Sequence, residues 1–155
     1  MEYDQQFMEH AFKLALESEA KANLPIGALI TDGQRIISEG RNGVMVPSFH
    51  PVRHAELEAL TKLEDQDVAR LDELAMYVTL EPCLMCLGSA VLHRIKIIFY
   101  ATEDPDRGAT YLLPQIAQRY PKKYLPVVRG PMLPERGSVL FERAKTLYRT
   151  VRPAT

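Results

Sequence analysis

The chain has 155 residues, enough for one domain with a hydrophobic core. Hydrophobic residues make up 46% and charged residues 25%, an ordinary balance that argues against a disordered chain. No stretch approaches the roughly 20 apolar residues that span a bilayer. The N-terminus, MEYDQQFMEH, lacks the basic start and apolar run of a secretory signal. We therefore expect a single domain over residues 1–155, located in the cytoplasm and not in a membrane.

Charge is spread unevenly along the chain, although the formal net charge is only −1. Residues 119–152 hold nine Lys or Arg and two acids, so this segment carries +7 and the remainder −8. Such asymmetry is typical of proteins that bind a polyanion, but the solvated faces of surface helices produce it as well. Both interpretations stay open at this point.

The first third of the chain reads as a helix followed by a hairpin. Apolar residues recur at helical spacing over 4–22, where Asp4 could cap the helix and Pro25 follows its end. The β-like runs ALITD and QRIISEG flank Asp32-Gly33, and Asp-Gly between such runs is a strong hairpin signal. A polar loop with Gly and Pro is expected over 40–51.

Helices and strands then alternate to the end of the chain. This order predicts a mixed β-sheet covered by helices on both faces, a three-layer α/β/α sandwich. The expected elements are a helix over 55–63, a strand over 75–80, a helix over 82–93, a strand over 95–101, a helix near 111–119, a strand over 125–129 and a helix over 134–149.

Two short segments carry the residues that best suit metal chemistry. One is His54-Ala55-Glu56, and the other contains Cys83 and Cys86, the two cysteines of the sequence. Two such close cysteines cannot form the disulfide framework of a secreted domain, so they read as metal ligands or a redox pair. Zn²⁺ accepts imidazole nitrogen and thiolate sulfur, and a catalytic zinc site keeps a fourth position open for water. We predict that His54, Cys83 and Cys86 bind Zn²⁺.

Glu56 supplies the remaining requirement of a hydrolytic zinc site. Zinc lowers the pKa of a bound water toward about 7, but the water still needs a proton acceptor and the leaving group a donor. One carboxylate beside the metal can do both, and Glu56 stands two residues after His54. H-x-E followed by P-C-x-x-C is the recorded signature of zinc deaminases. We therefore predict a hydrolytic deaminase with Glu56 as its catalytic residue.

These motifs resemble the cytidine deaminase superfamily, and within it the bacterial tRNA-specific adenosine deaminases and the guanine and cytosine deaminases. The resemblance covers nearly the whole chain, through LPIGALI, HPVRHAELEAL, MYVTLEPCLMCLGSAVLHRIKIIFYA and EDPDRGA. It implies a cytidine deaminase-like fold with a mixed five-stranded sheet, usually a homodimer. It also implies that Asn42 and the backbone at Ala55 bind the substrate.

Three residues near the expected substrate mouth depart from the family's pattern. Arg53 stands where a small residue is common, His50 replaces a frequent Asp, and Asp106 falls where the tRNA enzymes often have Lys. These departures leave the metal motif intact, and the sequence assigns them no role.

Several functions remain open from the sequence. The leading hypothesis is deamination of adenosine to inosine in a tRNA anticodon loop, with the basic C-terminal third on RNA phosphates and tyrosines stacking on bases. The alternative is a salvage enzyme acting on a free base or nucleoside, such as guanine or cytosine. A third hypothesis is a non-catalytic zinc protein of the same fold, but it would give Glu56 no function. A fourth is a redox role for Cys83 and Cys86, but zinc-bound thiolates do not cycle freely between thiol and disulfide.

Overall fold

A computed structural model describes residues 1–64, 67, 70 and 73–151 of the chain. Its centre is a five-stranded sheet in the order β2-β1-β3-β4-β5. The strands are β1 (Gly27–Thr31), β2 (Ile36–Arg41), β3 (Ala75–Val78), β4 (Ile97–Tyr100) and β5 (Val127–Arg129). The helices include α1 (Gln5–Ala20), α2 (Ala55–Leu60), α4 (Leu84–Leu92), α5 (Leu113–Ile116) and α6 (Pro134–Val151), with short 3₁₀ turns η2 (Thr110–Leu112) and η3 (Lys122–Tyr124).

The sheet is mixed, as predicted. The hairpin around Asp32-Gly33 pairs β1 with β2 antiparallel, and β1 also pairs antiparallel with β3. β3, β4 and β5 run parallel. Parallel strands need crossover connections, and α4 supplies the one between β3 and β4.

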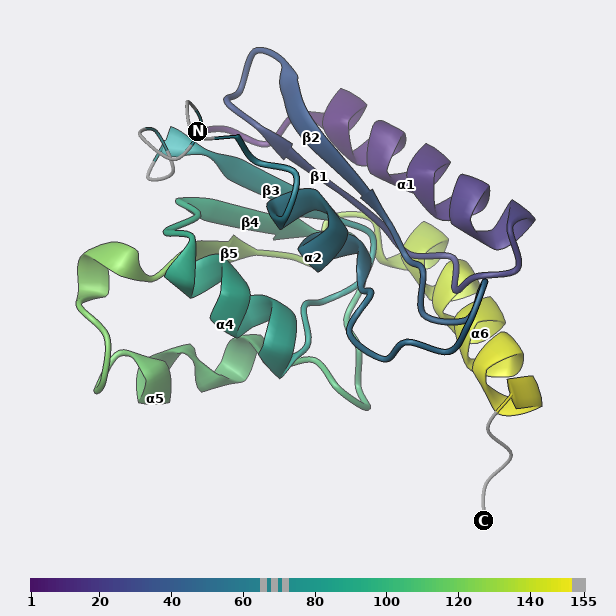
Figure 1. Ribbon diagram of the computed structural model, residues 1–155. Coiled ribbons are helices and arrows are strands. Elements are labelled where there is room, and N and C mark those ends of the chain that lie inside the picture. Colours follow the sequence, from purple (N-terminus) through teal and green to yellow (C-terminus); the bar gives the residue numbers. More distant parts are fainter. Residues whose placement is uncertain (65–66, 68–69, 71–72, 152–155) are drawn as a thin grey trace.

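Helices cover both faces of the sheet, which confirms the three-layer arrangement (Figure 1). Side chains alternate along each central strand, so Tyr77 and Phe99 pack in a cluster with Met8 and Phe12 of α1. Their neighbours Met76 and Ile98 belong to the opposite cluster, which includes buried residues of α2 and α4. α6 adds Leu140 to the α1 side.

Most helix limits follow the predictions, with three corrections. α1 begins beside Asp4, whose side chain accepts the Gln6 amide as expected. The helix predicted from residue 82 begins at Leu84, because Cys83 keeps an extended backbone and acts as the N-cap. The helix predicted through residue 63 ends at Leu60. The helix predicted near 111–119 is broken into η2 and the single turn α5.

One glycine allows the close packing that places α2. A Cβ at Gly40 of β2 would lie 1.8 Å from the Ala55 carbonyl oxygen, so only glycine lets the first turn of α2 approach the strand this closely. The first turn of α2 carries Glu56 and directly follows His54. Among the described residues, no helix has both the length and the apolar character needed to cross a membrane.

Candidate active site

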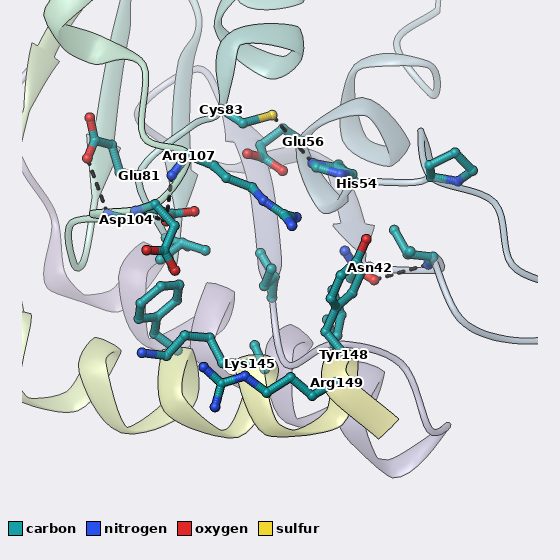
Figure 2. Close-up of a pocket in the computed structure, with 18 of the residues that line it drawn as sticks. Asn42, His54, Glu56, Glu81, Cys83, Asp104, Arg107, Lys145, Tyr148 and Arg149 are labelled. Carbon is teal, nitrogen blue, oxygen red and sulfur yellow. Dashed lines mark hydrogen bonds between the residues drawn. The ribbon is translucent and has the colours of Figure 1, made fainter. Parts of the chain in front are cut away.

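A cavity of about 370 Å³ opens at the carboxyl ends of the parallel strands, where open α/β sheets commonly bind ligands. Its lining includes the start of α2, the segment between β3 and α4, the loop over 103–109, and α6. His54, Glu56 and Cys83 lie at one end (Figure 2). Lys145 and Arg149 of α6 lie at the other end, and Arg107 reaches between them.

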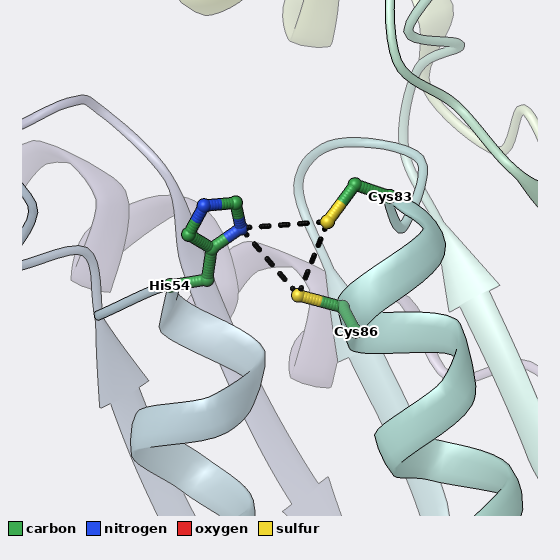
Figure 3. A group of neighbouring side chains, drawn as sticks. All are labelled: His54, Cys83 and Cys86. Atoms are coloured by element: carbon green, nitrogen blue, oxygen red, sulfur yellow. Dashed lines mark hydrogen bonds between the residues drawn. The ribbon is translucent and has the colours of Figure 1, made fainter. Parts of the chain in front are cut away.

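The three predicted metal ligands come together in a triangle (Figure 3). His54 Nδ1 lies 3.6 Å from Cys83 Sγ and 3.5 Å from Cys86 Sγ, and the two sulfurs are 3.6 Å apart. Tetrahedral zinc with ordinary bond lengths places its ligand atoms about 3.6 Å apart for nitrogen and sulfur, and about 3.8 Å for two sulfurs. The triangle therefore has the dimensions of a zinc site, with one coordination position left for a small molecule.

The local backbone favours the thiolate form of Cys83. Cys83 caps the N-terminus of α4, and the partial positive charge of a helix N-terminus stabilises an anionic sulfur. The hydrogen bond between the Cys83 and Cys86 sulfurs, together with the contact to His54, lowers the pKa of Cys83 to about 4. Cys83 thus provides a metal-ready ligand at neutral pH.

Glu56 lies beside the triangle without belonging to it. Its side chain is only 4% exposed, and it lines the cavity (Figure 2). Burial raises the pKa of this carboxyl above its ordinary value. Among the described residues, the group able to hold a metal consists of His54, Cys83 and Cys86 alone. Glu56 is thus a buried carboxyl next to the metal position and outside the ligand set.

Asn42 also lines the cavity and presents an unused donor. Its side chain is 3% exposed, and its Oδ1 accepts the Val44 amide at 3.0 Å. Its Nδ2 is buried without a hydrogen-bond partner in the described part of the chain. A buried unpaired donor is costly, so an acceptor on a ligand would stabilise it. Ala55 has a fully buried side chain in the core, and its expected backbone contact to substrate stays a prediction.

The three departures from the family's pattern have different surroundings. Arg53 forms an ion pair with Glu58 at 3.0 Å, on the outward side of α2. His50 is exposed and does not line the cavity. Asp106 is exposed and lines it.

The basic C-terminal third proves to be two separate regions. Residues 119–126 lead into β5, at the end of the parallel strands opposite the metal triangle, whereas α6 lines the cavity (Figure 1). The position of α6 on the cavity wall is a feature that the sequence did not predict. Helical spacing in the sequence shows which residues share one face of a helix, but it does not show what that face packs against. The residues of α6 that line the cavity are Phe141, Ala144, Lys145, Tyr148 and Arg149.

The fold and the triangle together define a class of protein, a zinc enzyme with a three-ligand site and a buried carboxyl beside it. The chain matches the cytidine and deoxycytidylate deaminase zinc-binding region over residues 1–102. It therefore belongs to that family of zinc-dependent hydrolytic deaminases, and His54, Cys83 and Cys86 are its zinc-binding group.

Relatives within the family act on different substrates. The chain is 40% identical to a tRNA-specific adenosine deaminase of Haemophilus influenzae over 110 residues, which are 70% of this chain and 63% of that protein. It is 39% identical to a guanine deaminase of Bacillus subtilis over 102 residues, 64% of this chain and 65% of that protein. The matched region thus spans under two thirds of either relative.

A solved structure from work on A-to-I editing by tRNA:A34 deaminases has the same fold. It superposes with a TM-score of 0.69 at 23% identity, covering 88% of this chain and 99% of that one.

Proposed function

We propose that the protein removes an exocyclic amino group from a nucleobase by zinc-dependent hydrolysis, releasing ammonia. The observation that carries this proposal is the buried carboxyl of Glu56 beside a triangle of zinc dimensions, both on the wall of one cavity. A purely structural zinc site is normally closed by four protein ligands and has no use for such a carboxyl.

The residues divide the work as follows. Bound zinc would lower the pKa of a water molecule and so supply the nucleophile at neutral pH. Glu56 accepts a proton from the attacking water and returns it to the amino group, which leaves as ammonia when the C–N bond breaks. Asn42 donates from Nδ2 to an acceptor of the substrate, and the backbone at Ala55 contacts the edge of the base. A reducing cytoplasm, expected from the sequence, would keep both thiols available for zinc.

The leading substrate is adenosine in a tRNA anticodon loop, converted to inosine. The similarity to tRNA-specific adenosine deaminases supports it. The second candidate is a free base such as guanine. Nearly equal similarity to a guanine deaminase favours it, as does the position of residues 119–126, away from the cavity.

Ammonia release by the zinc-loaded protein tests this proposal. The substrates are guanine, cytosine, adenine, their nucleosides and nucleotides, and a tRNA anticodon stem-loop, with Glu56→Ala as the inactive control. Release from one of them by the wild type alone supports the proposal. No release from any substrate by protein with a full zinc complement contradicts it.

We further propose that two copies pair through the outer face of α4. Leu84 and Leu92 are 58% and 67% exposed, and a Cβ at Gly88 between them would meet nothing within 4 Å. These residues are four apart, so they form one open apolar stripe suited to a second helix. Sedimentation should show a dimer that Leu92→Glu converts to a monomer. A wild-type monomer at micromolar concentration would contradict this assembly.

A further inference from the structure

The end of the cavity opposite the zinc triangle is cationic, and the proposed chemistry does not use it. Lys145 and Arg149 project from α6, and Arg107 reaches in from the loop over 103–109 (Figure 2). All three residues lie beyond residues 1–102, the part that matches the family. They are therefore candidates for a property that distinguishes this chain.

Most cations of α6 are already neutralised by partners. Arg136 and Arg143 form ion pairs with Glu9 and Glu19 of α1, on the side of the helix away from the cavity. Lys145 lies 2.6 Å from Glu142, one turn earlier. Arg149 forms no ion pair with any residue that the structure describes.

Arg107 is likewise without a carboxylate partner in the described ranges. Its guanidinium lies 5.0 Å from the centre of the Tyr148 ring, a cation–π contact that leaves its N–H groups available. The contact joins the loop over 103–109 to α6 across the cavity. Arg107 and Arg149 therefore both line the cavity, Arg149 at the α6 end and Arg107 between that end and the zinc triangle (Figure 2).

The acidic residues that line the cavity near these cations differ in how far their carboxylates are already engaged by other groups of the chain. Asp104 is buried, and its Oδ1 accepts the amides of Asp106 and Arg107 at 3.0 Å each, which fixes the loop. Glu81 accepts the amides of Asp104 and Thr110 and the Thr110 hydroxyl. Both carboxylates are thus committed to the chain's own donors. Asp106 is the exposed acid among these lining residues, which also include Arg107 and Arg149 without a carboxylate partner in the described ranges and Lys145 paired with Glu142.

We propose that Arg107, Lys145 and Arg149 form a phosphate subsite, so that the nucleobase arrives on a phosphorylated ribose. This inference rests on the proposed function and narrows its substrate class. Arginine binds phosphate through two parallel N–H bonds, which suits two unpaired guanidinium groups. The cavity of about 370 Å³ falls within the range for sites that enclose drug-sized ligands, about 300–1,000 Å³, and so holds more than one ring.

The phosphate group could belong to either of two molecules, a free nucleoside 5′-monophosphate or the backbone of an RNA strand. Asn42 and Glu56 would hold and process the base at one end, while Lys145 and Arg149 hold the phosphate at the other and Arg107 reaches it from between the two ends. A free base would leave the cationic end unused. The subsite therefore favours nucleotide or RNA over guanine itself.

The test compares Arg149→Ala with Arg143→Ala, which removes the same charge from the same helix on the face toward α1. Each zinc-loaded protein receives a nucleoside, its 5′-monophosphate and a stem-loop RNA containing the same base. We expect the wild type to prefer a phosphorylated substrate, and Arg149→Ala to lower kcat/KM for it by about tenfold or more, the value of a charge-assisted hydrogen bond. Turnover of the nucleoside, and all activities of Arg143→Ala, should stay unchanged.

Loss confined to the 5′-monophosphate assigns the subsite to free nucleotides, and loss confined to the stem-loop assigns it to RNA. An equal fall for nucleoside and phosphorylated substrate, or no fall, overturns the subsite. Calorimetric titration of the nucleoside 5′-monophosphate and of the stem-loop RNA into the wild type and both variants separates this result from failure of the proposed function. Binding of either ligand that Arg149→Ala alone abolishes supports the subsite even without turnover, and equal or absent binding of both ligands overturns it.

Discussion

The two ends of the cavity are built from the chain in different ways. The zinc end comes from two helix starts, with its ligands at residues 54, 83 and 86, inside the part that matches the family. The cationic end comes from the loop over 103–109 and from α6, outside that part. Because the reaction needs fixed ligands while the substrate differs between relatives, we infer that the zinc end serves the chemistry and the cationic end serves substrate recognition.

Loss of one zinc ligand should have the largest effect. Cys86 is fully buried at the triangle, and serine at this position offers a much poorer zinc ligand. We expect Cys86→Ser to fall from one zinc per chain to almost none, with deamination at background. Elemental analysis after dialysis measures the occupancy. Ser89→Ala in the same helix serves as the control and should keep its zinc. A full zinc complement in Cys86→Ser would disprove this ligand set.

Loss of Glu56, the proposed proton carrier, should have the second largest effect. Glu56→Gln keeps the size of the side chain but cannot accept a proton, so we expect kcat to fall by about 10²–10⁴-fold while zinc is retained. Glu58→Gln is a matched control, because Glu58 lies on the same helix but pairs with Arg53. A Glu56→Gln protein with near wild-type turnover would remove Glu56 from the mechanism.

The contrast between the two ends also explains what the sequence could predict. The hairpin, the Asp4 cap and the metal triangle follow from short-range signals, such as Asp-Gly between β-like runs and Cys83 at a helix start. The role of α6 depends on packing between distant segments. Its ion pairs join Arg136 to Glu9 and Arg143 to Glu19, more than 120 residues apart.

The limits of the short helices were harder to predict for a related reason. Hydrophobic spacing over 111–119 is compatible with one helix, but the chain forms η2 and the four-residue α5 instead. Pro114 lies within the first turn of α5, so it does not prevent a helix there. Local propensity is a weak guide where a segment forms few turns, since tertiary contacts then decide the ends.

Asn42 should affect substrate binding without affecting zinc. Asn42→Asp keeps the oxygen that accepts the Val44 amide but removes the unpaired Nδ2 donor. We expect kcat/KM to fall by about tenfold or more, the cost of one lost hydrogen bond to substrate together with its unpaired acceptor. Steady-state kinetics with parallel zinc analysis measures the effect. Unchanged kinetics would mean that this amide does not contact the substrate.

Acid should weaken zinc binding gradually. Near neutral pH this change in zinc affinity should be the smallest of the predicted effects. The contact with Cys83 raises the pKa of His54, so its ring holds a proton up to a higher pH than an ordinary histidine. Zinc must displace that proton, and its affinity should therefore fall as pH falls, by about tenfold per unit for each proton displaced. Competition with a chromophoric chelator between about pH 7.5 and 5.5 measures this slope. An affinity independent of pH would contradict it.

X-ray absorption spectroscopy of the zinc-loaded protein tests the central claim most directly. An open site made by His54, Cys83 and Cys86 predicts two sulfur neighbours at about 2.3 Å and two lighter neighbours at about 2.0–2.1 Å, one from imidazole and one from an exchangeable small molecule. Addition of a competing anion should change only the exchangeable neighbour. A spectrum with fewer than two sulfurs, or with a fourth ligand that never exchanges, would contradict a catalytic zinc site.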